Sequence, residues 1–350
     1  MEEKVLEAEE LETKKENPVL KVLKAIGRGI LKFFKFFDKN NHKSSRSTML
    51  EWKKDGWKAA LCLAPALILL SIFTFYPIIK TFIVSFFPEY NYITGEFGQF
   101  GFESYETVLG DPLFWKGLGN TALMLVISVP LSIVVALIIT VLLNSIKKLQ
   151  GFFQTIFFLP YVTNGIAFGL VFATIFSPLD TGLVNSLLNT TIAWTGTTAE
   201  IPYWAGLLVI TIYTVWNGLA FKILVFLGGL QGIDKQYYQA AQIDETPKWR
   251  VFTKITVPLL SPMIIYIAIT STIGAFKSYS SIVGIFGEAM GNSQDHTFIT
   301  VVGYIYEYFQ YIYQRPDFLS ISSAAAVILF IIILIVTFFQ LLYNKKKVHY

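Results

Sequence analysis

The sequence is poor in the residues on which disulfide bonding, metal binding and catalysis depend. Its 350 residues include one cysteine, Cys62, and three histidines. A single cysteine excludes an internal disulfide framework, and its place inside an apolar run favours a small packing residue. The histidines fall in predicted loops or tails, away from any cluster with metal-ligand spacing. We therefore expect no catalytic residue and no metal site.

Other absences narrow the functional classes further. The chain lacks G-x-x-x-x-G-K-[ST], so it has no phosphate-binding loop of its own. Its long apolar segments contain no Asp or Glu that could relay a proton, which argues against an ion-driven secondary transporter. They contain no Arg cluster either, which argues against a phosphate-bearing cargo. Nothing in the composition indicates nucleic-acid binding.

The sequence is rich in long apolar segments. It is 54% hydrophobic and 15% charged, whereas soluble domains carry about 25% charged residues. A membrane-spanning helix needs about 20 consecutive, mostly apolar residues. The prediction is an all-α membrane protein with six transmembrane helices, the first of which can continue to Phe87. These segments are Ala59–Ile79, Leu118–Leu143, Phe152–Phe176, Trp204–Leu230, Val257–Phe276 and Ile321–Tyr343. Prolines 65, 77, 130 and 160 are expected to kink them.

The loop charges predict the orientation in the cell membrane. Basic residues follow the second, fourth and sixth segments, whereas the loop after the first segment is acidic and the loop after the third has no Lys or Arg. Cytoplasmic loops carry the excess of Lys and Arg. Both termini and the loop after the fourth segment are therefore expected on the cytoplasmic side.

Residues 1–50 are expected to form a cytoplasmic extension, and residues 51–350 the six-helix domain. Within the extension, basic residues recur every three or four positions from Lys21 to Lys35. This spacing favours an amphipathic helix on an anionic membrane surface. A solvated basic tail is the alternative.

The polar loop of residues 231–258 has the pattern of two short helices. Asp234 is a suitable N-cap for the first helix. Pro247 restricts Thr246 to extended backbone and so ends that helix. A second helix can begin at Lys248 and enter the membrane through Pro258. The small Ala240 and Ala241 leave one helical face nearly flat, where a partner's groove could close on it.

This loop resembles the cytoplasmic coupling loop of ABC-importer permeases, whose motif is E-A-A-x3-G-x9-I-x-L-P. Segments 111–144 and 151–176 also resemble the carbohydrate subfamily. The sequence has Gln239 for Glu, Glu245 for Gly and Val257 for Leu. The positions expected to contact an ATPase are Tyr238, Gln239, Ala240, Ala241, Asp244, Glu245, Ile255 and Pro258. Glu245 leaves the helix break at the usual Gly in question, although Pro247 can supply one.

The resemblance implies a permease subunit of an ATP-driven importer for a carbohydrate, in particular an oligosaccharide. Its expected partners are a second homologous permease, two ATPase subunits and an extracellular solute-binding protein. ATP and Mg would be bound by the ATPases, with no cofactor on this chain. The same machinery importing glycerol phosphate or a peptide is the alternative cargo reading. An ion-driven transporter is the alternative mechanism.

Polar and aromatic residues of the spans are candidates for the substrate pathway: Asn164, Tyr213, Trp216, Asn217, Lys222, Phe276 and Tyr279. The aromatic rings could stack on sugars or pack against lipid and the core. The asparagines could bind sugar hydroxyls or tie helices together. Lys222 could face a cavity or extend to the cytoplasmic surface.

Overall fold

The computed structural model describes residues 60–146, 150–179, 182–196, 200–292, 294–315 and 317–345. Every regular element within these ranges is a helix, as predicted. The chain divides by its internal contacts into two units, Met1–Ile83 and Val84–Tyr350. The expected amphipathic helix and the boundary at residue 50 lie outside the described residues.

The first described helix, Ala60–Val84, contains a π-helical segment, Ser71–Phe75, followed by α4, Tyr76–Val84. The helix passes Lys80, which confirms the predicted extension beyond Ile79. The π-helical segment lies directly before Pro77, one of the positions where a distortion was expected. Cys62, expected to be a packing residue, is instead exposed.

Three helices of the second unit are also long and apolar enough to cross a membrane: α6 (Pro112–Ser145), α10 (Tyr203–Gln231) and α17 (Phe318–Lys345). Two further spans are bent pairs. In the first, α7 (Gln150–Val162) meets α8 (Gly165–Ile175) at 100°. In the second, Lys248–Leu259 meets α14 (Ser261–Phe276) at 67°. Counting each bent pair as one span gives the predicted six.

The prediction of one kinked helix over Phe152–Phe176 was wrong, because the structure has two helices there. The break follows Pro160, which lacks the N–H that continues a helix. The Thr163 hydroxyl donates to the carbonyl of Pro160 at 3.0 Å. Asn164 then adopts an extended backbone, and its side chain accepts the Ile166 N–H at 2.8 Å. The chain therefore ends one helix and caps a new one within two residues.

The second bend lies at Leu260, between two prolines. The preceding helix comprises α12 (Lys248–Val251), a π-helical segment (Phe252–Thr256) and α13 (Val257–Leu259). Pro262 has no N–H to donate to the carbonyl of Pro258, so the ladder is interrupted there. In contrast, α6 runs unbroken through Pro130, so not every proline in the spans ends a helix.

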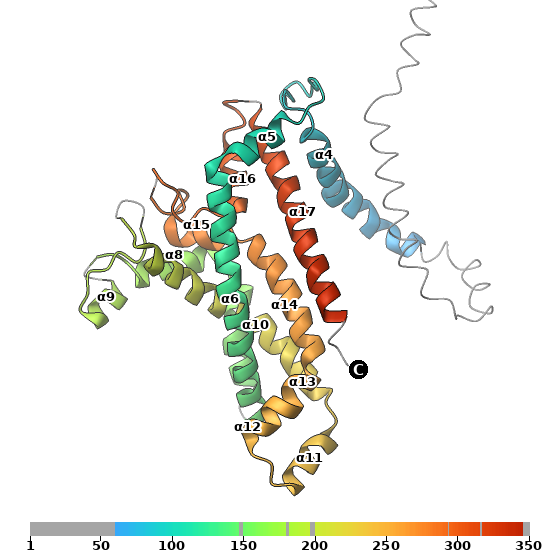
Figure 1. Cartoon of the computed structure of the whole chain (residues 1–350), viewed down its shortest axis with the longest axis vertical. Coiled ribbons are helices and arrows are strands. Elements are labelled where there is room, and N and C mark those ends of the chain that lie inside the picture. Colours follow the sequence, from blue (N-terminus) through green and yellow to red (C-terminus); the bar gives the residue numbers. More distant parts are fainter. Residues whose placement is uncertain are drawn as a thin grey trace, which may run out of the picture. The chain divides into compact units, whose positions relative to one another are not determined.

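Shorter helices lie at the ends of the second unit. Figure 1 shows α5 (Glu103–Gly110) and α16 (Val301–Gln310) at one end. The loop that carries α11 (Lys235–Ile243) and α12 lies at the opposite end. We call these the outer end and the coupling end.

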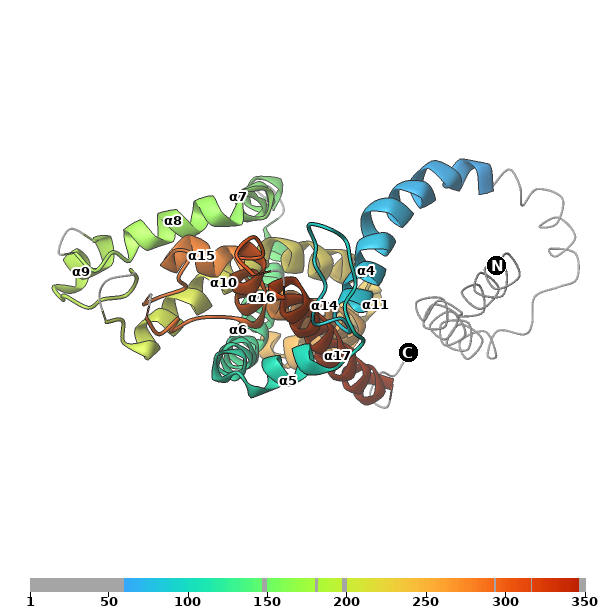
Figure 2. The same ribbon diagram turned by 90° about the horizontal axis from the view of Figure 1, so that it is seen from above.

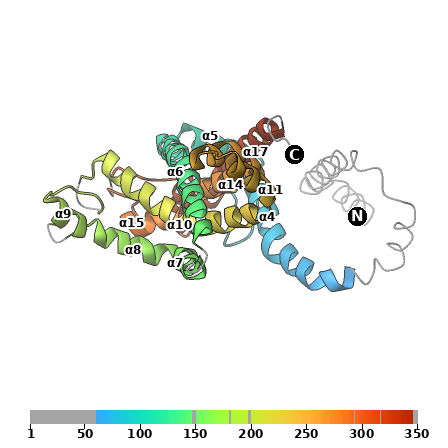
Figure 3. The same ribbon diagram turned by 90° about the horizontal axis from the view of Figure 1, so that it is seen from below.

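Two buried clusters hold the second unit together, and α10 contributes to both. The first cluster includes Ile210, Phe286 and Tyr304, and extends toward the outer end. The second joins α6, α10 and α14 through residues such as Phe226 and Ile267. Helix α10 also packs along α6 and α7 (Figure 3). It is thus the central helix of this unit.

Helices α8 and α15 (Ser280–Phe286) lie side by side (Figure 2). Their contact is made by two glycines. A Cβ added at Gly169 would lie 2.6 Å from the Gly284 Cα, and one at Gly284 would lie 2.8 Å from the Ile166 carbonyl oxygen. The two backbones therefore touch directly, as small residues allow at helix contacts in membranes. A third helix, α9 (Leu183–Leu188), follows α8.

Hydrogen bonds fix the outer end. The Asp111 carboxylate caps α6 by accepting the Leu113 N–H at 2.8 Å. It also accepts the hydroxyls of Tyr304 and Tyr308, each at 3.0 Å. Burial, together with Tyr308 and Asp111, raises the pKa of Tyr304. The phenol therefore stays a neutral donor and links α16 to the start of α6.

Candidate functional site

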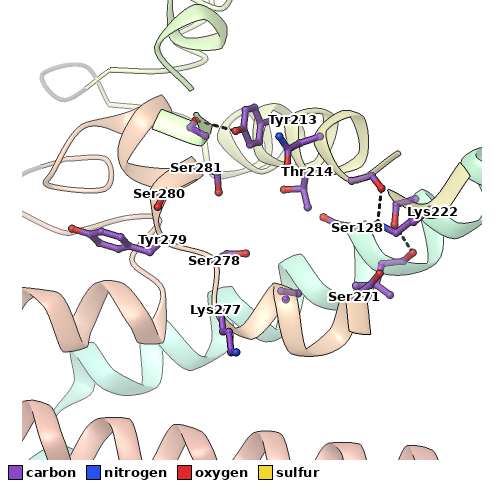
Figure 4. A pocket seen from close by; sticks show the side chains of 17 residues that line it. Ser128, Tyr213, Thr214, Lys222, Ser271, Lys277, Ser278, Tyr279, Ser280 and Ser281 are labelled. Carbon is purple, nitrogen blue, oxygen red and sulfur yellow. Dashed lines mark hydrogen bonds between the residues drawn. The ribbon is translucent and has the colours of Figure 1, made fainter. Parts of the chain in front are cut away.

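A cavity of about 350 Å³ opens between the membrane-spanning helices of the second unit. Its volume falls in the range of small-molecule sites, about 300–1,000 Å³. It is formed by α6, α10, α14, the first residue of α8, the segment that joins α14 to α15, and the first two residues of α15. Figure 4 shows its labelled lining residues: Ser128, Tyr213, Thr214, Lys222, Ser271, Lys277, Ser278, Tyr279, Ser280 and Ser281. Hydroxyl groups predominate among them.

Lys222 is the charged group held inside this cavity. Its side chain is 8% exposed, and its ammonium donates to the carbonyl of Gly218 at 3.3 Å, one turn earlier in α10. The sequence left open whether Lys222 extends to the cytoplasmic surface. The structure places it in the cavity lining instead.

Four of the seven predicted pathway residues line the cavity: Tyr213, Asn217, Lys222 and Tyr279. The Tyr213 hydroxyl donates to the Gly165 carbonyl at 3.0 Å, and the Asn217 amide donates to the Pro160 carbonyl at 3.3 Å. Both side chains therefore line the cavity and also tie α10 to the broken α7–α8 span.

The other three predicted residues lie elsewhere. Asn164 is the cap of α8 described above. Phe276 is 5% exposed and belongs to the buried core. Trp216 packs its ring against Phe168 and Phe172, with centroid distances of 4.9 and 5.5 Å. None of the three is a lining residue of this cavity.

Sequence reasoning missed the small hydroxyl residues of the lining. Ser128 and Ser132 stand four residues apart on α6, and Ser280 and Ser281 begin α15. Spacing by four places two side chains on one helical face, so a search of the spans for such hydroxyl pairs could have found the first two. The Ser128 hydroxyl is buried and has no hydrogen-bond partner in the part of the chain that the structure describes.

Tyr279 marks the side of the cavity away from Lys222 in Figure 4. Its ring stacks on Tyr306 with centroids 4.2 Å apart. Burial, Tyr306 and the carboxylates of Glu288 and Glu307 raise its pKa. Tyr279 therefore presents a neutral hydroxyl at neutral pH.

At the coupling end, local hydrogen bonds determine where α11 begins and ends. Asp234 accepts the Gln236 N–H at 2.9 Å and caps the N-terminus. At the C-terminus, Glu245 adopts the left-handed conformation, with φ of 51°. The Thr246 and Glu245 N–H groups donate to the carbonyls of Ala241 and Gln242. This Schellman arrangement is the one that Gly usually completes. Glu245 thus ends α11 in the conformation that Gly usually adopts, although the sequence had left the helix break at this position open.

The flat face expected at Ala240 and Ala241 is only partly present. Ala241 is 6% exposed and packs within this chain, whereas Ala240 is exposed. The prominent apolar side chains of the loop are instead Ile243 and Trp249, which are 83% and 73% exposed. Tyr238 faces inward and its hydroxyl lies 3.3 Å from that of Thr256. A partner at this end would therefore meet Ile243, Trp249 and Ala240.

The remaining positions predicted to contact an ATPase also differ in their exposure. Gln239, Asp244, Glu245 and Pro258 are exposed, and Ile255 is half-buried. Across the described residues, no three His, Cys, Asp or Glu side chains are grouped as metal ligands would be.

Comparison with known proteins places this geometry in a family. The chain is 33% identical over 274 residues to the lactose transport system permease protein LacF of Rhizobium radiobacter. This alignment covers 75% of this chain and 86% of that protein. The chain is 31% identical over 249 residues to the arabinooligosaccharides transport system permease protein AraP of Halalkalibacterium halodurans, covering 70% and 75%.

A similar fold occurs in the crystal structure of a bacterial alginate ABC transporter in complex with alginate pentasaccharide-bound periplasmic protein. The TM-score is 0.67 at 19% identity, over 83% of this chain and 94% of that one. Residues 128–349 match the family described as the binding-protein-dependent transport system inner membrane component. That stretch includes the coupling-end loop and the whole cavity lining. The chain belongs to this family of inner-membrane transport permeases.

Proposed function

We propose that this chain forms half of the membrane pathway of an ATP-driven importer whose cargo is an oligosaccharide. The observation that carries the proposal is the exposed coupling-end loop, in which Ile243 and Trp249 project from two short helices. Large exposed apolar side chains mark surfaces that bind a partner. An ATPase subunit is the partner that a permease of this family requires at such a loop.

The proposed assembly contains a second homologous permease, two ATPase subunits and an extracellular solute-binding protein. ATP and Mg are bound by the ATPases, and the chain itself catalyses no reaction. The coupling end faces the cytoplasm, as do both termini, because Lys235, Lys248, Arg250 and Lys254 lie there. The acidic residues Glu103 and Glu106 on α5 lie at the outer end, which receives the binding protein.

The cargo class rests on the cavity and on the relatives. Hydroxyl and amide groups such as Thr214, Ser278 and Asn217 suit the hydroxyls of a sugar. The named substrates of the two relatives, lactose and arabinooligosaccharides, are sugars. The intact loop spacing favours this function over the ion-driven alternative.

The proposal is tested by removing the two exposed apolar side chains together. The variant Ile243→Asp/Trp249→Ala is expected to lose the co-purifying ATPase and the uptake of oligosaccharide, because a buried Asp in the docking groove is costly. Insertion into the membrane should be unchanged. For the co-purification of the ATPase, the matched control is Ile93→Asp, since Ile93 is 71% exposed and lies before α5, away from the coupling end.

If the double variant retains the ATPase and transports at the wild-type rate, this loop does not couple the chain to ATP. Uptake that persists after ATP depletion and collapses with an ion gradient would favour the secondary transporter instead.

A further inference from the structure

The cavity contains a positive charge that no described residue neutralises. A lysine ammonium has three N–H donors, and that of Lys222 has one acceptor in the described residues, the Gly218 carbonyl. No carboxylate of the described residues lies within ion-pair distance of it. An intramembrane charge is costly and is generally paired or functional. Two donors and one charge are therefore left for another group in the cavity.

The surrounding helices offer no such group. Helices α6, α8, α10, α14 and α15 contain no Asp or Glu. Two carboxylates, those of Glu288 and Glu307, affect a lining residue electrostatically, and that residue is Tyr279. Figure 4 shows Tyr279 and Lys222 on opposite sides of the cavity. The electrostatic field across the cavity is thus asymmetric, with its positive side at Lys222.

The glycine one turn earlier leaves room for the ammonium. A Cβ added at Gly218 would lie 2.6 Å from the Lys222 Nζ, so a larger residue there would displace the end of this side chain. The hydroxyl of Ser128, which also lines the cavity, is buried and has no hydrogen-bond partner among the described residues. Lys277 lines the cavity as well, but its side chain is exposed and extends away from Ser278 and Ser281 in Figure 4.

We propose that the cargo is an acidic saccharide that carries a carboxylate, and that Lys222 binds this group and sets the preference for charge. This inference rests on the proposed function and specifies its substrate class. The hydroxyls of Ser128 and Thr214 then bind the sugar beside the acidic group. The acidic group then accepts a charge-assisted hydrogen bond from the Lys222 ammonium, whose acceptor among the described residues is the Gly218 carbonyl. A neutral sugar of equal size would leave that charge unpaired.

The test uses the complete transporter, with its partner permease, ATPases and binding protein, in proteoliposomes. Two panels of short oligosaccharides are compared as stimulants of ATPase activity. The neutral panel comes from partial hydrolysis of starch, cellulose, xylan and galactan, and the acidic panel from polygalacturonate, alginate and hyaluronan. Sodium acetate at equal ionic strength tests whether a free carboxylate suffices. The acidic panel alone is expected to stimulate.

Three variants then assign the preference to the cavity. Lys222→Met keeps the chain length and should raise the KM for the stimulating acidic saccharide about tenfold or more, the loss of one hydrogen bond to a charged group. Removing an intramembrane charge favours insertion, so this variant should assemble. Lys222→Arg keeps the charge and should retain most of the response. Lys116→Met, which removes a positive charge paired with Asp295 outside the cavity, should change the KM less than Lys222→Met does.

Each outcome decides between the two proposals. Stimulation by the neutral panel alone would overturn the inference and leave the oligosaccharide importer intact. An unchanged KM in Lys222→Met would also overturn it, because another group, such as a carboxylate of the partner permease, would then neutralise Lys222. Stimulation by acetate would show a simple anion site rather than a saccharide site. No response to either panel would overturn the proposed function itself.

Discussion

Among single residues, Glu245 shows how a position can require a conformation rather than a side chain. Its φ of 51° belongs to the left-handed region, which costs a residue with a Cβ about 1–2 kcal/mol. Glycine avoids this cost but loses about 0.5–1 kcal/mol in backbone entropy. The resembled motif has Gly here because glycine is the cheaper of the two.

We therefore expect Glu245→Gly to stabilise the end of α11 by about 0.5–1 kcal/mol. Hydrogen exchange of the Thr246 amide, which donates to the Ala241 carbonyl, should become slower. Glu245→Val is the opposing control, because a β-branched side chain tolerates this conformation poorly. Faster exchange in the glycine variant would mean that the Glu245 side chain itself holds the turn.

Lys222 shows the limit of sequence reasoning for single residues. Sequence position placed it about two turns from the cytoplasmic end of its span, where extension to the surface was plausible. In the structure, the ammonium instead lies over the helix, where Gly218, four residues earlier, leaves room for it and its carbonyl accepts the hydrogen bond. The sequence also argued against a phosphate-bearing cargo because it has no Arg cluster in the spans. It could not show that α6, α10 and α14 surround one lysine with hydroxyls.

At the scale of elements, the direct backbone contact of α8 and α15 positions one wall of the cavity, because Ser280 and Ser281 begin α15. Gly284→Ala should destabilise the protein by about 1–3 kcal/mol, the usual cost of overpacking. The added Cβ would meet backbone atoms of Ile166 and Gly169, which cannot move aside like a flexible side chain.

Thermal unfolding of the purified chain in detergent measures this loss as a lower Tm. Gly119→Ala is the matched control, since a Cβ there meets no atom within 4 Å. Equal Tm values for the two variants would show that the α8–α15 contact relaxes without cost.

The six spans could be predicted because their signal is apolar length, which each segment carries by itself. The two large bends could not. Pro160 and Pro130 both lie within apolar runs, yet the chain breaks after Pro160 and α6 continues through Pro130. The difference lies in the residues after each proline, since Asn164 caps a new helix shortly after Pro160. A proline marks a weak point, and neighbouring polar groups decide whether the helix ends there.

At the scale of the whole molecule, the prediction to be tested is the orientation of the chain in the membrane. In a Cys62→Ser background, cysteines at Glu106 and Ser186 should react with an impermeant maleimide added to intact cells. A cysteine at Ser145 should react only after lysis. These positions are exposed, whereas Ser104 and Thr195 beside the same loops are each 2% exposed and would give false negatives. External labelling at Ser145 would reverse the assigned topology.

The exposed Ile243 and Trp249 also bear on how a cell balances the numbers of its subunits. If the loop docks an ATPase on the cytoplasmic side, as proposed, a copy of this chain made without an ATPase would present both side chains to the cytosol. Such apolar exposure would mark unassembled copies for removal by chaperones and membrane proteases, whereas assembled copies would be shielded. The docking surface would then also report that assembly is complete, and the scarcer ATPase would set the number of transporters that persist.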